Sequence, residues 1–110
     1  MYIIGREDLG AAYMSVQSIH AAIQFQHEHP EYAECWYKES NYLGFLSVLN
    51  EEELNILIEK AAEKDIKISV FREPDIENQI TAIALAPGPA AKKLCSNLKL
   101  ALRGNNGKSC

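Results

Sequence analysis

The residues best suited to chemistry lie near the N-terminus, in a segment with helical spacing. Five polar side chains follow one another there at intervals of four and three residues: Tyr13, Gln17, His20, Gln24 and His27. On a helix, this spacing places them along one line. The imidazoles can gain or lose a proton near neutral pH, which suits a general acid or base. The alternative is a polar helix edge, solvated or half-buried, that has no catalytic role.

A second group of polar residues lies much further along the chain. It comprises the segment Glu73-Pro74-Asp75 and, after it, Thr81. Two carboxylates and a hydroxyl can accept and donate hydrogen bonds around a reacting group. However, Pro and Asp are favoured in turns for backbone reasons, and Thr suits the beginning of any strand. On the residues alone, a plain turn is therefore the alternative to a site.

Neither a metal site nor a disulfide framework is predicted. His27 and His29 are two residues apart, and on a helix such side chains point in different directions. The three cysteines are Cys35, Cys95 and Cys110. Their odd number, without a Cys-x-x-Cys pair, argues against a zinc ribbon and favours a reducing compartment. We therefore expect no metal and no other cofactor.

The composition indicates one globular domain. The chain has 110 residues, of which 47% are hydrophobic and 24% charged, and a chain of this size can bury one core without disulfides or metals. No apolar run approaches the roughly 20 residues that a membrane helix needs. The N-terminus lacks a basic leader followed by a long apolar stretch. We therefore expect a cytoplasmic protein with no membrane partner.

Charge is distributed unevenly along the chain. The formal net charge of −4 argues against a nucleic-acid partner, because cationic side chains supply most of that affinity. Yet all 15 acidic residues lie at or before Glu77, and the remainder is purely basic. The basic residues there are Lys92, Lys93, Lys99, Arg103 and Lys108. This asymmetry permits a local anion-binding face, and a basic tail that serves solubility is the alternative.

The apolar periodicity predicts a single α/β domain over residues 1–103 and a flexible tail over 104–110. Strands are expected at 2–5, 42–49, 66–71 and 80–85, and helices at 13–28, at 31–38, after Asn50, and from Ala91 to about Gly104. Asn50 and Glu53 form a capping-box pattern. Residues 42–49 are almost entirely apolar, which favours a central strand. We expect a four-stranded mixed sheet with helices packed on its faces.

Two stretches share their order and spacing with a known family. The first is Arg6-Glu7-Asp8-Leu9 followed by Gln17-Ser18-Ile19-His20-Ala21-Ala22, and the second is Phe71-Arg72-Glu73-Pro74-Asp75 followed by Thr81-Ala82-Ile83-Ala84-Leu85. They resemble the Arg-x-Asp-Leu and Ala-Gln-x-x-His-Ala signatures, the loop and the last strand of type 2 peptidyl-tRNA hydrolases. The second stretch is similar to a branch with Glu-Pro in place of Asp-Ala-Gly. The similarity extends over residues 1–103.

The sequence departs from the family at one functional position. Typical members place a Gly-Lys pair four residues ahead of the signature glutamine, and that lysine is usually assigned a catalytic or substrate-positioning role. Ala12 and Tyr13 occupy these places here. A neutral phenol stabilises developing charge less than an ammonium does, which predicts a slower enzyme or a different substrate. The family's loop aspartate corresponds best to Glu73, with Asp75 as a rival.

The resemblance implies a carboxylic ester hydrolase that acts in translation and releases a peptide from tRNA by attack of water. The residues that would carry the reaction are His20, Gln17, Glu73, Asp75, Thr81 and Tyr13. His20 would be the base or the group that orients water, with Glu73 or Asp75 fixing its tautomer. Gln17 and Thr81 would donate to the oxyanion, and the Tyr13 hydroxyl would take the place of the lysine.

Partners follow from the same resemblance. Lys92, Lys99 and Arg103 are predicted on one face of the closing helix, where they would contact tRNA phosphates. The alternative is a solvated helix face with cations near its C-terminal end. Because family members commonly pair, a homodimer is expected. Two other functions stay open: a catalytically silent module that binds tRNA or a protein, and a hydrolase of small esters or amides.

Overall fold

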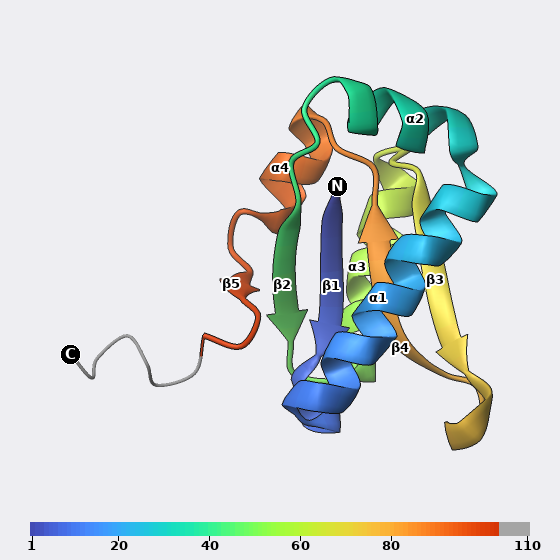
Figure 1. The fold of residues 1–110 in the computed structure, drawn as a ribbon. Coiled ribbons are helices and arrows are strands. Elements are labelled where there is room, and N and C mark those ends of the chain that lie inside the picture. Colours follow the sequence, from blue (N-terminus) through green and yellow to red (C-terminus); the bar gives the residue numbers. More distant parts are fainter. Residues whose placement is uncertain (104–110) are drawn as a thin grey trace.

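Four apolar segments and one short later segment form the sheet at the centre of this α/β domain. The computed structural model describes residues 1–103, and the tail predicted to be flexible, 104–110, lies outside them (Figure 1). The strands are β1 (Tyr2–Arg6), β2 (Gly44–Val48), β3 (Ile68–Glu73), β4 (Gln79–Leu85) and β5 (Lys99–Leu100). Their order across the sheet is β3-β4-β1-β2-β5. β1 and β2 are parallel and the other neighbours are antiparallel, so the predicted mixed sheet is confirmed.

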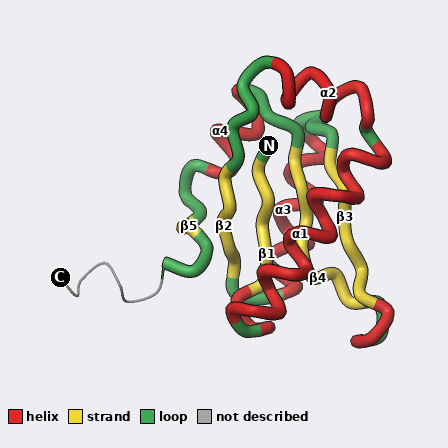
Figure 2. Tube along the Cα trace, viewed as in Figure 1, coloured by secondary structure: helices red, strands yellow, loops and turns green. Residues whose placement is uncertain are grey.

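Helices cover both faces of this sheet (Figures 1 and 2). The helices are α1 (Ala11–Glu28), α2 (Pro30–Lys38), α3 (Glu51–Glu63) and α4 (Pro89–Cys95), with short 3₁₀ turns η1 (Glu7–Leu9) and η2 (Pro74–Ile76). Side chains of α1 and α2 contribute to one apolar cluster, and those of α3 and α4 to another on the opposite face. Within residues 1–103, none of the helices combines the length and the apolar character that crossing a membrane requires.

The start of α3 follows the predicted capping pattern. The Asn50 side chain accepts a hydrogen bond of 3.1 Å from the Glu53 N–H, one of the amides that a helix start leaves unpaired. The return bond differs from the usual box, because the Glu53 carboxylate accepts from the Leu49 N–H at 2.7 Å. The pair therefore ties the end of β2 to the first turn of α3.

The predictions for the C-terminal part and the strand count were wrong. The sheet has five strands rather than four, because α4 ends at Cys95 and Lys99–Leu100 then pair with β2. The Ala101 N–H extends this pairing with a bond of 2.9 Å to the Phe45 carbonyl. Apolar spacing continues helically through this region, but the free edge of β2 offers backbone partners that outweigh the local preference. The segment 42–49 contains β2, which is an interior strand between β1 and β5 as predicted.

The face of the sheet under α1 is built from small residues. The alanines of β4 and its end lie there, at Ala82, Ala84 and Ala86. At Gly5 of β1, a Cβ atom would lie only 2.6 Å from Met14 Cγ, so α1 approaches the strand more closely than any larger residue would allow. This close approach brings the polar side chains of α1 against the sheet.

Candidate active site

A chain of hydrogen bonds joins three of the predicted site residues from three elements. The Thr81 hydroxyl of β4 donates to Gln17 Oε1 at 2.6 Å, and Gln17 Nε2 of α1 donates to Glu73 Oε1 at 2.9 Å. Gln17 and Thr81 are only 1% and 0% exposed. The protein itself therefore supplies hydrogen-bond partners for the buried side chains of Gln17 and Thr81, as the burial of polar groups requires.

A β-bulge aims Thr81 at α1. Phe71 of β3 pairs with Ala82, but the next residue, Arg72, pairs with Ile80, so Thr81 is the extra residue in β4. Ile80 packs into the cluster on the α3 face, and Ala82 into the cluster on the α1 face. Thr81 therefore shares the α1 face with Ala82, although regular alternation would place neighbours on opposite faces.

Glu73 is held as an anion at the end of β3. The Asp75 N–H donates to Glu73 Oε2 at 3.1 Å, so both carboxylate oxygens are engaged. These bonds lower the pKa of Glu73, the backbone bond from Asp75 contributing most, then the bond from Gln17, with a smaller effect of the nearby His20. Of the two rival carboxylates, Glu73 is thus the one that joins the buried chain, while Asp75 is exposed.

His20 lies at the surface one helical turn beyond Gln17. Its ring stacks on the ring of Phe71, with centroids 4.6 Å apart and planes 5° apart. Within residues 1–103, neither Glu73 nor Asp75 forms a hydrogen bond with the imidazole. The predicted bond by which a carboxylate would fix the tautomer of His20 is therefore absent from the described residues. Stacking on Phe71 orients the ring instead. Sequence reasoning gave Phe71 no role, although strand alternation places it on the same face as Glu73.

Tyr13 lies one turn before Gln17, close to both carboxylates. Burial, and then the negative charges of Glu73 and Asp75, raise the pKa of its phenol. The hydroxyl therefore stays protonated and can donate a hydrogen bond. Glu73 bonds to Gln17, whereas Tyr13 and His20 lie one helical turn before and after it, and all three retain some exposure.

The last two of the five polar residues on α1, Gln24 and His27, have a structural role or are exposed to solvent. Gln24 Nε2 donates to the Val70 carbonyl at 3.0 Å and to the Glu28 carboxylate at 2.9 Å. The other carboxylate oxygen of Glu28 accepts from the Ser69 hydroxyl at 2.6 Å. His27 is exposed. The line of five residues thus divides: its first three members gather near Glu73, and its last two do not.

The three cations predicted to bind phosphate do not share a helix face, which corrects that expectation. Lys92 lies on α4, whereas Lys99 lies in β5 and Arg103 follows it. Lys99 and Arg103 line one hollow of about 420 Å³ beside the start of α1. Within it, Lys99 Nζ lies 2.9 Å from Glu7 Oε2, and this contact contributes most to a lowered pKa of Glu7. The Lys99 ammonium is therefore already paired with a carboxylate, for which an anionic ligand would have to compete.

Comparison with known protein families identifies the family to which this protein belongs. The family model for peptidyl-tRNA hydrolase PTH2 matches residues 1–101, which include Gln17, Glu73 and Thr81. The match covers nearly the whole chain, so this protein belongs to the peptidyl-tRNA hydrolase PTH2 family. The resemblance predicted from the two sequence stretches is confirmed at this level. The chain matches no curated protein.

Proposed function

We propose that this protein hydrolyses the ester between a peptide and the terminal ribose of tRNA. Membership in the peptidyl-tRNA hydrolase PTH2 family supports the reaction class. The observation that carries the proposal is the hydrogen-bonded chain from Thr81 through Gln17 to Glu73, which ends beside an exposed imidazole. A hydrogen-bonded chain that is buried at Thr81 and Gln17 and ends next to a titratable group is what a preorganised catalytic site needs.

In the proposed mechanism, His20 accepts the proton of the attacking water. The water oxygen bonds to the ester carbonyl carbon, and the resulting oxyanion accepts a hydrogen bond from the Tyr13 hydroxyl. As the bond to the ribose oxygen breaks, the His20 imidazolium returns the proton to that oxygen. The anion at Glu73 stabilises the imidazolium without taking its proton, because the bonds from Gln17 and Asp75 keep it ionised.

Gln17 and Thr81 act as positioning residues in this mechanism. Their polar atoms are buried and bonded to one another or to Glu73, so they hold the carboxylate in place and do not contact the substrate. This assignment replaces the expectation that they donate to the oxyanion.

The hollow that contains Lys99 and Arg103 is the proposed contact for tRNA phosphates. It lies beside the first turn of α1, the helix that also carries Tyr13 and His20. Binding of tRNA should weaken as salt rises, because each neutralised phosphate releases counterions. Replacing Arg103 by Gln should reduce the salt dependence by about one ion, and Lys92→Gln, on a different element, serves as its control. An equal effect of both substitutions would contradict the assignment.

The homodimer expected from the family is also proposed, through the outer face of α1. Val16, Ile19 and Ile23 form an exposed apolar ridge there, with 49%, 59% and 59% of their surfaces accessible. Beside the ridge lies an apolar hollow of about 220 Å³ that includes Leu43 and Phe45. A ridge next to a hollow on one face can be self-complementary about a two-fold axis.

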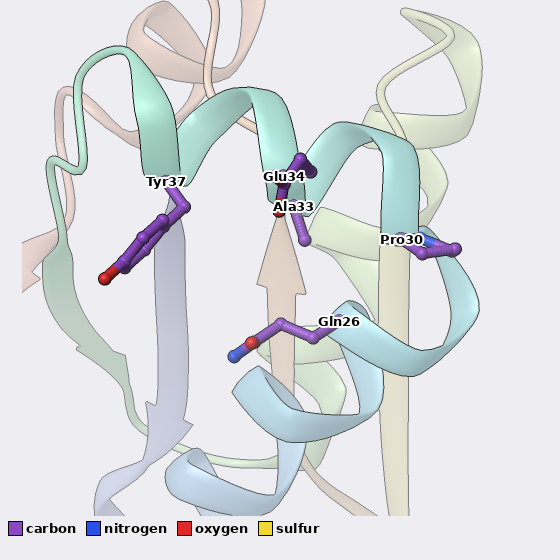
Figure 3. Close-up of a pocket in the computed structure, with 5 residues that line it drawn as sticks. All are labelled: Gln26, Pro30, Ala33, Glu34 and Tyr37. Atoms are coloured by element: carbon purple, nitrogen blue, oxygen red, sulfur yellow. The ribbon is translucent and has the colours of Figure 1, made fainter.

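A second hollow flanks the same outer side of α1. It lies between α1 and α2 and is lined by Gln26 of α1 and Tyr37 of α2 (Figure 3). Sedimentation velocity should detect a dimer that Ile19→Glu converts to monomer. The control Ile56→Glu, an exposed residue of α3, should leave the dimer intact. A parent protein that sediments as a monomer at micromolar concentration would remove this part of the proposal.

Tyr13 in place of the family's lysine favours one alternative, a catalytically silent module that binds tRNA. Hydrolysis of labelled peptidyl-tRNA distinguishes the two functions. The proposed enzyme should lose turnover about 100-fold or more on His20→Ala, as removal of a general base does. The matched control is His27→Ala, an exposed histidine on the same helix, which should keep parental activity. Binding of tRNA without turnover by the parent protein would support the silent module.

A further inference from the structure

Ile80 of β4 pairs with Arg72 of β3 but lies beyond the last residue pair with β1, Gly5 and Ala82. At Ile80, the carbonyl accepts a bond of 3.0 Å from Arg6 Nη1, and the N–H donates a bond of 2.9 Å to Glu51 Oε2. Ile80 is buried, and unpaired backbone groups in such a place are costly. Two side chains from β1 and α3 therefore complete the hydrogen bonding of the residue just before Thr81.

Arg6 is itself held on several sides. Its guanidinium forms a two-bond contact with Asp8, at 3.0 and 2.9 Å, and donates to Gln79 Oε1 at 2.9 Å. Only 6% of Arg6 is exposed, so this buried charge is paired by a carboxylate and by two further acceptors. Gln79 is the cross-strand partner of Glu73. One side chain thus links η1 to both the bulge and the strand pair that carries Glu73.

We propose that Arg6 and Glu51 are positioning residues that hold the bulge and thereby aim Thr81 at Gln17. The inference rests on the proposed function, because it takes the chain from Thr81 to Glu73 as part of the active site. Neither residue contacts a substrate in this scheme. Their effect on the reaction passes through Thr81.

The physical reason lies in the period of a strand. Removing the bulge by a slip of one residue would turn the Thr81 side chain to the opposite face of the sheet, away from Gln17. The bonds from Arg6 and Glu51 hold Ile80 opposite Arg72, which is the pairing of the bulged register. In the regular register Thr81 would occupy that place, so these bonds favour the bulge. Without them, Gln17 Oε1 loses its donor for part of the time, and the Gln17–Glu73 bond loosens with it.

The experiment compares Arg6→Lys and Glu51→Ala with the control Glu52→Ala. Lysine keeps the charge of Arg6 but cannot reproduce the four bonds of its guanidinium. Glu52 is the exposed neighbour of Glu51 in the first turn of α3. For both test variants we expect kcat to fall by up to about 100-fold, as a displacement of roughly 1 Å can cause, with KM almost unchanged. Glu52→Ala should match the parent protein.

Two further measurements separate positioning from a general loss of stability. In NMR spectra, the side-chain amide resonances of Gln17 should shift in Glu51→Ala toward their values in Thr81→Val. In a double-mutant cycle, adding Glu51→Ala to Thr81→Val should lower kcat no further. Glu51→Ala provides the test if Arg6→Lys does not fold.

Failure of the positioning role of Arg6 and Glu51 can be distinguished from failure of the proposed hydrolase function. If the parent protein hydrolyses no peptidyl-tRNA, the hydrolase assignment fails, but the Gln17 resonances still decide whether Glu51 positions Thr81. Unshifted Gln17 resonances in Glu51→Ala would overturn the inference. Fully additive losses of kcat in the double variant would overturn it as well.

Discussion

The two faces of the sheet bury different kinds of side chain. Toward α3 and α4 the core is almost wholly aliphatic, with large residues such as Ile4, Leu54 and Ile83 fully enclosed. Toward α1 and α2 it combines alanines with a few large residues such as Phe25, and the polar side chains of Gln17 and Thr81 are also buried on this face. Aliphatic burial needs no particular partner, whereas a buried polar group needs a donor or acceptor at one position. One face therefore stabilises the fold, and the other specifies the geometry of the candidate site.

The largest loss of stability should follow truncation of an aliphatic residue on the α3 and α4 face. Leu54→Ala should lower the free energy of unfolding by about 2–5 kcal/mol, because the cavity adds to the lost burial. Its control on the same helix is Ile56→Ala, which is 46% exposed and should cost less than about 0.5 kcal/mol. Urea denaturation measures both. Specific activity of the folded Leu54→Ala protein should stay parental, and a selective loss of activity would contradict the division between the faces.

On the α1 face, a substitution should lower the free energy of unfolding less than Leu54→Ala does, but it should reduce activity more. Thr81→Val leaves the buried Gln17 carbonyl oxygen without its donor, which should cost about 1–3 kcal/mol and reduce kcat. Adding Gln17→Leu removes the unsatisfied group, so stability should recover while activity does not. Denaturation and peptidyl-tRNA hydrolysis on the two variants test this. Recovery of both properties together would mean that the polar pair serves the fold alone.

The acid side of the stability curve should depend on Glu73. Its pKa in the folded protein lies below the ordinary value of 4.5, so the folded state favours the anion. The stabilisation is present above about pH 4.5 and is lost as pH falls through the folded pKa. Glu73→Gln should therefore flatten the decline in urea midpoint below pH 4.5. Glu77→Gln, an exposed neighbour beyond η2, is the control and should keep the parental slope.

The smallest effect concerns thiol chemistry. Cys35 on α2 is exposed, whereas Cys95 on α4 is buried, and burial raises the pKa of its thiol to about 11. In a Cys110→Ser background, a thiol reagent at pH 7 should modify one cysteine in the native protein and two in urea. Mass spectrometry should locate the native modification at Cys35. Rapid native modification of Cys95 would mean that the α3 and α4 face opens more readily than its packing implies.

The sequence by itself determined the elements whose signals are local. Helical spacing of apolar residues identified α1 and α3, the pair Asn50 and Glu53 marked the start of α3, and β-branched runs identified β3 and β4. The family was also predicted from the order of its motifs, and the gathering of Gln17, Glu73 and Thr81 followed from that resemblance. These features depend on residues that are close in sequence or on the order and spacing of family motifs.

Only the tertiary structure decided the remaining features. β5 exists because the edge of β2 accepts Lys99 and Leu100, and the same pairing ends the predicted closing helix at Cys95. The register shift that turns Thr81 toward Gln17 depends on backbone pairing with β3. Strand register and buried hydrogen bonds join residues that are far apart along the chain, so no local periodicity encodes them.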